Sequence, residues 1–323
     1  MSNYRKYFGQ KNITRRSFLK ISFLFISYYL TRALFPKSIS AKENTSGPRP
    51  KSNIKGDYDL VLAEGDNSYQ NTVKAIKAIG GMERFVRKNS VVVIKPNIGW
   101  DRTPEQAANT DPFVVACLVE LAYKAGARRV NVFDNPCNDA RRCYLNSGIK
   151  KHVEEKGGYV YFPDDWNTVK AKFNYKSPME GWPIYRDALE CGTFINVPVL
   201  KHHGLTGLTL SMKNLMGVCS GVRGEIHDGI GKKLADLTDF INPDLTVIDA
   251  HRVLIRNGPS GGRLEDVITL NKLIVSTDPT LADAYAAKIL DIDPLSIPYI
   301  KEAVLKNFGT IDFDKANILK ISV

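Results

Sequence analysis

The sequence of 323 residues lacks several short motifs that identify common enzyme classes. No G-x-G-x-x-G follows its first predicted strand, and it contains no Walker loop and no G-x-S-x-G nucleophile motif. Its five cysteines are too few for a small disulfide scaffold, and none has C-x-x-C spacing. The dinucleotide-binding, P-loop and hydrolase classes are therefore unsupported, and a ferredoxin-type iron–sulfur cluster is not expected.

The basic charge is concentrated at the amino terminus. The formal net charge is +11, but residues 1–40 hold eight basic and no acidic residues, which leaves 37 basic against 34 acidic residues in the rest. That remainder is ordinary for a globular protein, with no footprint of nucleic-acid binding. We therefore expect no nucleic-acid partner.

The first 40 residues are organised like an export signal. Residues 14–20 are Thr-Arg-Arg-Ser-Phe-Leu-Lys, and an apolar run from Ile21 to Leu30 follows them. The segment resembles the twin-arginine signal, Ser/Thr-Arg-Arg-x-Phe-Leu-Lys, at all six specified positions. The resemblance implies transport of the folded protein by the twin-arginine translocase into the periplasm or cell envelope. Such transport suits a protein that acquires a cofactor or metal in the cytoplasm.

Two fates of this segment stay open. Ser38 and Ser40 offer small residues for cleavage before Ala41. The alternative is an uncleaved signal anchor, although Ile21–Phe35 is shorter than the roughly 20 residues of a membrane span and Arg32 interrupts it. Membrane contact is expected only through this segment. Residues 41–56, rich in Pro, Gly, Ser, Asn and Lys, are predicted to be a linker.

Residues 57–323 are predicted to form an α/β domain with a largely parallel or mixed sheet and helices on both faces. Short apolar runs typical of buried strands alternate with helical patterns such as Phe113–Ala125 and Leu281–Leu290. Residues 163–190 break this alternation and are predicted to be an insertion or flap. The predicted strands are Leu60–Ala63, Val91–Lys95, Val130–Asp134, Tyr159–Phe162, Phe194–Val197, Leu245–Asp249 and Lys272–Ser276.

Candidate functional residues are densest after the predicted strand Phe194–Val197, where Lys-His-His is followed by a turn rich in Gly and Thr. Polar groups at the carboxyl ends of parallel strands face the crevice where α/β proteins bind ligands. Lysines and asparagines there favour a small anionic ligand. The candidate ligand- or cofactor-binding residues are Lys95, Asn97, Lys201, Asn214, Gly258 and Gly261. The candidate catalytic residues are His203, Lys213 and His227.

Histidines and cysteines leave further alternatives open. His203 and His227 are candidate ligands of a metal ion, with His251 and Asp249 as further donors, although the spacing fits no closed zinc motif. These histidines could equally serve as hydrogen-bond partners. Cys137 and Cys143 could form a disulfide after export.

The chain from Lys95 onward resembles the family named domain of unknown function 362, whose activity is not settled. Many members carry a ferredoxin-like iron–sulfur segment, and this chain lacks its cysteines. The residues that carry the resemblance are Lys95–Asn97, Thr110–Pro112, Asn196–Pro198, Lys201, His203, Leu205–Gly207, Lys213–Leu215, His227, Pro243–Asp249, Asn257–Pro259, Ser276–Pro279 and Ile297–Tyr299.

A second resemblance is confined to Lys213, Gly217 and His227. It is similar to the region of nickel-dependent lactate racemases in which a lysine bears the nickel pincer cofactor and a later histidine binds the metal, although the spacing differs. It implies that His203 or His251 is an acid/base group for 2-hydroxy-acid chemistry.

Two functions from different classes follow from these patterns. The first is an exported enzyme that depends on a cofactor or metal and acts on an anionic small molecule. The second is a non-catalytic envelope protein that binds a small ligand or partner. The sequence does not identify the cofactor; a metal ion is the candidate.

Overall fold

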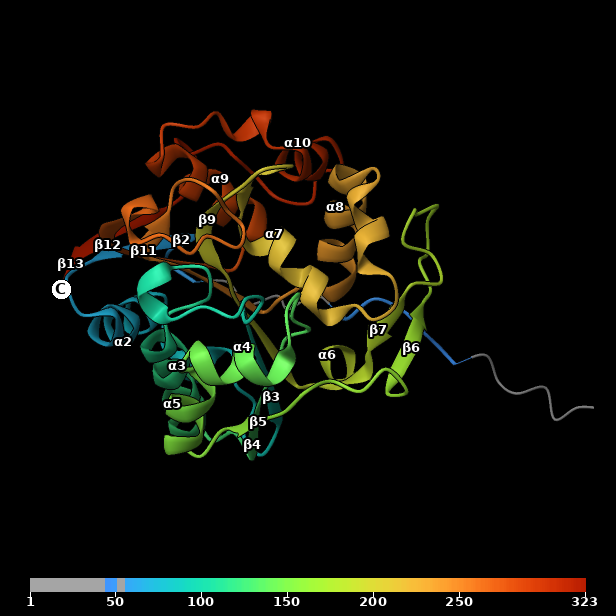
Figure 1. Cartoon of the computed structure of the whole chain (residues 1–323), viewed down its shortest axis with the longest axis horizontal. Coiled ribbons are helices and arrows are strands. Elements are labelled where there is room, and N and C mark those ends of the chain that lie inside the picture. Colours follow the sequence, from blue (N-terminus) through green and yellow to red (C-terminus); the bar gives the residue numbers. More distant parts are fainter. Residues whose placement is uncertain (1–43, 51–55) are drawn as a thin grey trace, which may run out of the picture. The chain divides into compact units, whose positions relative to one another are not determined.

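The computed structural model describes residues 44–50 and 56–323, and the fold below is that of the unit from Thr45 to Val323 (Figure 1). A mixed ten-stranded sheet forms its centre. Its strands are β2 (Leu60–Glu64), β3 (Val91–Pro96), β4 (Arg129–Val132), β5 (Tyr159–Val160), β8 (Thr193–Val197), β9 (Val199–His203), β10 (Gly207–Thr209), β11 (Leu245–Leu254), β12 (Val267–Ser276) and β13 (Ile318–Ser322).

Among the described strands on the main path of the sheet, all but β12 run in the same direction. Along its main path the strand order is β13-β2-β12-β11-β8-β3-β4-β5. Strands β11, β8, β3, β4 and β5 are parallel to one another, whereas β12 is antiparallel to both β11 and β2. Off this path, β9 runs parallel to β11 and forms a hairpin with β10. The carboxyl ends of β3, β4 and β8 therefore meet at one edge of the sheet.

Helices cover both faces of this sheet (Figure 1). Alternate strand residues point into two separate cores: Val93 and Phe194 into one, Ile94 and Ile195 into the other. This alternation is the period of two that a strand imposes on its side chains. The helices are α2 (Ser68–Ala78), α3 (Pro112–Lys124), α4 (Ala140–Asn146), α5 (Ile149–Glu155), α6 (Arg186–Glu190), α7 (Ser211–Asn214), α8 (Ile230–Ile241), α9 (Pro279–Ile289) and α10 (Pro298–Leu305).

The predicted α/β class with helices on both faces is confirmed, and each predicted strand and helix has a counterpart within a few residues. Helices α3 and α9 begin as the Thr-Asp-Pro patterns indicate. The Asp111 and Asp278 side chains accept backbone N–H groups of the first turn, and proline occupies the first helical position. Strands β11 and β12 are longer than predicted, because their antiparallel pairing continues beyond Asp249 around a register shift.

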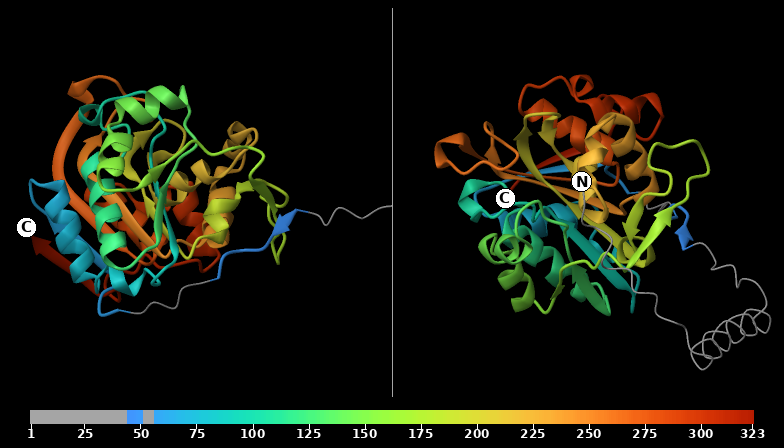
Figure 2. Two further views of the ribbon diagram at one scale, coloured as in Figure 1. Left: turned by 90° about the horizontal axis from the view of Figure 1, so that it is seen from below. Right: turned by 45° about the vertical axis from the view of Figure 1, so that its right-hand side comes forward.

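Residues 163–190, predicted as an insertion or flap, form a small sheet of their own. Strands β6 (Thr168–Ala171) and β7 (Pro183–Tyr185) are antiparallel, and β1 (Thr45–Ser46) pairs with β6 (Figure 2). Their side chains, including Met179 and Ile184, pack into one of the two cores. The segment is thus joined to the domain by apolar contacts.

The described part of the predicted linker is attached to the domain. Arg49 is buried, and its guanidinium donates to the Asp244 carboxylate at 2.9 Å and to the carbonyls of Ile241 and Asn242. The predicted signal lies outside the described residues. Within residues 44–50 and 56–323, no helix has the length and apolarity of a membrane span.

Candidate functional site

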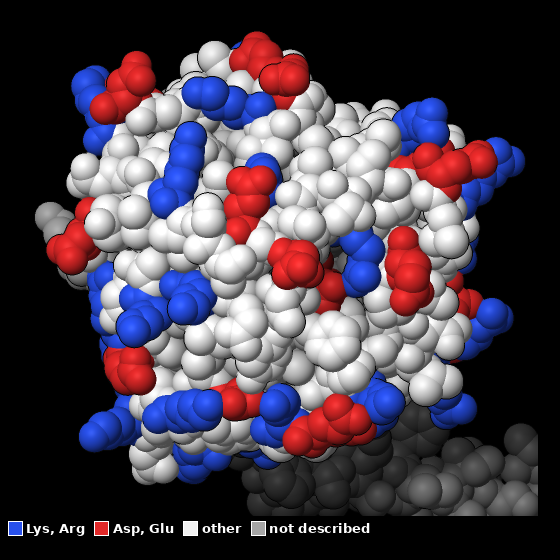
Figure 3. All heavy atoms as spheres, turned by 90° about the vertical axis from the view of Figure 1, so that its left-hand side faces the viewer, with Lys and Arg blue, Asp and Glu red and all other residues white. Residues whose placement is uncertain are grey.

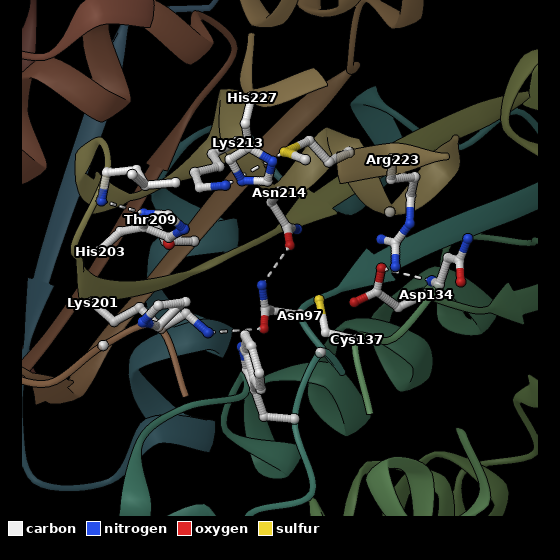
Figure 4. A pocket seen from close by; sticks show the side chains of 18 of the residues that line it. Asn97, Asp134, Cys137, Lys201, His203, Thr209, Lys213, Asn214, Arg223 and His227 are labelled. Carbon is white, nitrogen blue, oxygen red and sulfur yellow. Dashed lines mark hydrogen bonds between the residues drawn. The ribbon is translucent and has the colours of Figure 1, made fainter. Parts of the chain in front are cut away.

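A cavity of about 350 Å³ opens at the edge where β3, β4 and β8 end. This volume suits a small-molecule ligand. Its walls come from β3, the segments after β3 and β4, the β9–β10 hairpin, α7, η3 (Leu215–Val218), η4 (Arg223–His227) and the loop after β11. The polar side chains that line it are Lys95, Asn97, Asp134, Asn135, Cys137, Lys201, His203, Thr209, Lys213, Asn214, Arg223 and His227 (Figure 4).

Eight of the nine predicted ligand-binding and catalytic residues line this cavity, and Gly261 does not. Gly258 belongs to the lining because of a close backbone approach: a Cβ there would lie 2.0 Å from the carbonyl oxygen of His202. Gly261 instead has φ +53° in the loop after β11, so the structure does not bring this predicted residue to the cavity. Its carbonyl accepts a hydrogen bond from Arg102 at 3.4 Å.

One side of the cavity is built on a buried ion pair. Lys95 Nζ lies 2.8 Å from Asp134 Oδ1, and both side chains are nearly inaccessible to solvent. Lys95 also donates to Asn214 Oδ1 at 2.9 Å and to the Pro96 carbonyl. Asp134 further accepts the backbone N–H of Ile98 at 2.7 Å. Because Lys95 is buried and its ammonium is occupied by these partners, its role is to support the fold of the cavity wall.

Asn214 holds this ion pair to the rest of the sheet edge. Its Oδ1 accepts from Lys95 and, at 3.1 Å, from Asn97 Nδ2. Its Nδ2 donates to the Lys95 carbonyl and to Asn196 Oδ1 at 2.8 Å. Both donor and both acceptor positions of this amide are used, so Asn214 positions its neighbours and has no group left for a ligand.

Gly217 lets η3 pass directly over the ion pair. A Cβ at this position would lie 1.8 Å from Asp134 Oδ1 and 2.7 Å from Lys95 Nζ. No rotation of either buried side chain relieves such an overlap without breaking their contact. The glycine is therefore required by close approach to the Lys95–Asp134 pair.

Three further cations of the cavity have no carboxylate partner within ion-pair distance among the described residues: Lys201, Lys213 and Arg223. Lys201 Nζ donates to the carbonyl of Ala108 and, at 3.3 Å, to Asn97 Oδ1. Arg223 donates to the carbonyl of Pro136 at 2.8 Å. The cavity thus carries an excess of positive charge.

Lys213 has the weakest partner of these cations. Its Nζ lies 3.4 Å from the thioether sulfur of Met216, a poor acceptor. Burial lowers the pKa of Lys213 to about 8, and Arg223 contributes in the same direction. Burial lowers the pKa of Lys201 to about 7, with Lys213 and Lys95 adding to the effect. Both amines therefore lack the stabilisation that a carboxylate would give their charged forms.

The two cavity histidines have opposite tautomers. The backbone N–H of Leu205 donates to His203 Nδ1 at 3.1 Å, so the proton of neutral His203 sits on Nε2. His227 Nδ1 lies 3.1 Å from the Gly224 carbonyl, which only accepts, so Nδ1 carries the proton and Nε2 a lone pair. Burial and the charge of Lys213 lower the pKa of both rings, that of His203 to about 3. The centroids of the two rings lie 6.1 Å apart, and the ring planes are nearly parallel.

The predicted metal-binding set does not assemble. His251 lies in another cavity, lined also by Asp111 and Arg252, with its Nε2 2.7 Å from Asn71 Nδ2. The Asp249 carboxylate accepts the backbone N–H groups of Asp111 and His251. Residues 44–50 and 56–323 contain no group of three His, Cys, Asp or Glu side chains placed to hold a metal ion. The metal prediction at His203 and His227 therefore lacks its further ligands.

The suggested disulfide is also absent: Cys137 and Cys143 are both free thiols. Cys143 packs inside the core as part of α4, whereas Cys137 is exposed and lines the cavity. Their side chains face different surroundings, since α4 directs Cys143 inward.

Sequence reasoning missed several residues of the cavity. Asp134 is the last residue of the predicted strand Val130–Asp134, and this position at a strand end was the signal that could have found it. Arg223, Trp100 and Thr209 gave no such signal, because tertiary contacts alone bring them to the cavity. Thr209 is 4% exposed, and its hydroxyl has no hydrogen-bond partner among the described residues.

Comparison with known proteins finds a curated relative and several similar solved structures, among them the two below. A thylakoid-associated protein from Synechocystis sp. is 28% identical over 241 residues, which are 69% of this chain and 70% of that protein. The lactate racemase apoprotein from Thermoanaerobacterium thermosaccharolyticum is 12% identical with a TM-score of 0.47 and covers 71% of this chain. A Thermotoga maritima protein is 12% identical with a TM-score of 0.41 and covers 75%.

This chain spans only 56% and 60% of the lengths of those two solved structures. At this identity and these TM-scores, neither likeness supports a statement about activity. The family comparison is more extensive, because residues 92–288 match the domain of unknown function DUF362. That match includes β3, β8, β9, α7 and most of the cavity, and it covers more than half of the chain. The chain therefore belongs to the DUF362 family.

Proposed function

We propose that this protein is an enzyme that binds a small anionic molecule in the cavity and moves a proton on it. One observation carries the proposal: Lys201, Lys213 and Arg223 converge on a cavity whose single acidic side chain, Asp134, is already paired with Lys95. Lys201 and Lys213 are buried, so their charged forms are costly without a counter-charge, and a bound carboxylate or phosphate would supply it.

The two histidines supply the proton-transfer groups. Neutral His227 offers the lone pair of Nε2 as a base, and neutral His203 offers its Nε2–H as a hydrogen-bond donor to an oxygen that gains charge. Figure 4 places both rings beside Lys213 on one wall of the cavity. A base and an oxyanion donor next to a cationic subsite favour removal of a proton from a carbon of a bound carboxylic acid.

The face of the molecule shown in Figure 3 has no block of basic side chains that would attract an anion as the cavity does. Basic and acidic side chains are interspersed there, without a continuous block of one sign. An anionic ligand is therefore expected to be drawn to the cavity, where cations are gathered and unpaired.

Two measurements test the proposal. Calorimetric titration with a panel of small carboxylates and inorganic phosphate should reveal a ligand, and Lys201→Met should weaken its binding about tenfold or more. Lys232→Met, on the exposed surface of α8, is the matched control. No binding by any member of the panel would refute the anion site.

The catalytic part needs its own readout. Nuclear magnetic resonance in deuterated water should show exchange of a carbon-bound hydrogen of the bound acid. His227→Gln should abolish that exchange while binding persists. Binding without exchange in the unmodified protein would instead favour the non-catalytic ligand-binding alternative.

We also propose that the protein is exported by the twin-arginine route. The support is the pattern of residues 14–20 and the apolar run behind it. Replacing Arg15 and Arg16 with lysine should leave the protein in the cytoplasmic fraction of its host, whereas Lys11→Gln, outside the motif, should not. The amino terminus of the protein recovered from the envelope distinguishes cleavage from anchoring.

A further inference from the structure

Lys213 is the cavity residue whose chemistry is least explained by charge alone. It is 8% exposed and lines the cavity, yet the thioether of Met216 is its one hydrogen-bond partner among the described residues. A lysine that served only as a cation would be better stabilised by a carboxylate or carbonyl oxygen. An amine left without an oxygen acceptor keeps its electron pair available once it loses a proton.

The neighbours of Lys213 differ from those of the other cavity lysines. Lys95 is held in the ion pair with Asp134, and Lys201 is held by the carbonyl of Ala108 and by Asn97. Lys213 and Lys201 are both close enough to His203 for their charges to lower its pKa, but of the cavity lysines Lys213 is the one that also lowers the pKa of His227. Of the three amines it alone combines weak tethering with adjacent proton-transfer groups.

We propose that Lys213 forms a Schiff base with the carbonyl carbon of a 2-oxo acid whose carboxylate is held by Lys201. This inference rests on the proposed anion site and names its substrate class. Burial lowers the pKa of Lys213 to about 8, which leaves a useful fraction of neutral amine at neutral pH. Thr209 lies opposite Lys201 in the β9–β10 hairpin and lines the same cavity. Its hydroxyl has no hydrogen-bond partner among the described residues.

The step is balanced by the groups present. Nζ begins as an ammonium, loses one proton to His227 Nε2 and attacks the carbonyl carbon, while the carbonyl electron pair moves to oxygen beside the His203 Nε2–H. A second proton leaves the nitrogen, and both protons reach the oxygen through His227. The C–O bond breaks, water departs, and the nitrogen electron pair forms the protonated imine, which keeps the third proton.

Reductive trapping tests this assignment. The full-length protein is incubated with pyruvate and sodium borohydride, which transfers hydride to the imine carbon and fixes the adduct as a secondary amine. Mass spectrometry of the intact chain and of its peptides should show one adduct, on Lys213. Lys213→Arg keeps the positive charge but cannot form an imine, so its adduct should fall to background. Lys232→Arg, on an exposed lysine of α8, should be trapped like the unmodified protein.

The controls separate the two proposals. Propionate has the carboxylate of pyruvate but lacks its 2-oxo group. It should therefore compete with pyruvate for the site and raise the melting temperature of the protein without forming an adduct. If pyruvate and propionate raise the melting temperature but pyruvate leaves no adduct, the Schiff base is refuted and the anion site stands. If neither pyruvate nor propionate binds, the 2-oxo-acid proposal fails, and the anion site fails with it only if no other carboxylate and no phosphate of the panel binds. An adduct on Lys201, located by peptide mapping of the unmodified protein, overturns the assignment to Lys213 whether or not the variant folds.

Discussion

Lys95 and Lys213 line the same cavity and are both buried, but their surroundings are opposite. Lys95 contacts Asp134, Asn214 and the Pro96 carbonyl, so every direction of its ammonium is occupied. Among the described residues, the hydrogen-bond partner of Lys213 is one thioether, that of Met216. The pKa of both is lowered by burial, but Asp134 opposes that effect at Lys95 and no carboxylate opposes it at Lys213.

The presence or absence of a carboxylate partner thus separates a lysine that supports the cavity wall from one that we propose takes part in ligand chemistry. Breaking the contacts of Lys95 leaves a buried charge uncompensated, which destabilises the fold. Replacing Lys213 removes a charge that has no counter-charge, so we expect the free energy of unfolding to rise and the proposed ligand chemistry to be lost. The two lysines therefore predict stability changes of opposite sign.

The largest effect is expected where the ion pair is broken. Asp134→Asn leaves Lys95 buried without a counter-charge and should lower the free energy of unfolding by about 3–5 kcal/mol. Denaturant titration measures it. The matched control is Glu154→Gln, which breaks the solvent-exposed pair with Lys150 and should change stability little. An equal loss in both variants would mean that burial of the Lys95 pair has no special weight.

The second effect has the opposite sign and depends on pH. The folded-state pKa of Lys213 is about 8, below its ordinary 10.5, so the folded protein binds fewer protons than the unfolded chain between these values. The free energy of unfolding should therefore rise with pH across that window, and the full cost of the lysine persists below it. Lys213→Met should stabilise the protein at pH 7 by up to about 3 kcal/mol.

Thermal or denaturant unfolding between pH 7 and pH 10 measures this difference. In Lys213→Met the rise with pH should be flatter than in the unmodified protein, while Lys232→Met, on the surface of α8, should keep the original slope. A destabilised Lys213→Met at pH 7 would show that this lysine belongs with Lys95 in supporting the fold.

A smaller loss is expected at Gly217. The added methyl of Gly217→Ala would overlap Asp134 Oδ1, so η3 must shift or the ion pair must open, at about 1–3 kcal/mol of unfolding free energy. Gly47→Ala is the control, because a Cβ there meets nothing within 4 Å. If both variants unfold at the same denaturant concentration, the close approach of η3 to the ion pair is not required.

The smallest change concerns two buried hydroxyls without partners, those of Thr209 and Thr246. Replacing either with valine keeps the shape and removes an unsatisfied group, so each variant should gain about 1 kcal/mol or less of stability. The variants should differ in ligand binding, since Thr209 lines the cavity and Thr246 does not. Calorimetric titration with pyruvate should show weaker binding for Thr209→Val alone. Equal affinities would place the Thr209 hydroxyl outside the site.

The sequence by itself determined the secondary structure and most of the cavity. Apolar runs mark strands buried on both faces, and aspartate followed by proline marks the starts of α3 and α9, because these signals depend on near neighbours in the chain. Lys95, Asn97, Lys201 and Lys213 were predictable because strand ends gather at one edge of a parallel sheet.

The tertiary structure decided what each of those residues does. The pairing of Lys95 with Asp134 joins groups far apart in sequence, and the lack of a carboxylate near Lys213 depends on all the segments that surround it. The tautomers of His203 and His227 are set by nearby backbone groups, those of Leu205 and Gly224, whose directions depend on the local fold. Tertiary contacts also separate His251 from the other histidines and Cys143 from Cys137. Sequence patterns identify which polar residues reach the cavity, but charge compensation is a property of three-dimensional neighbours, so only the folded chain distinguishes a lysine paired with a carboxylate from one without such a partner.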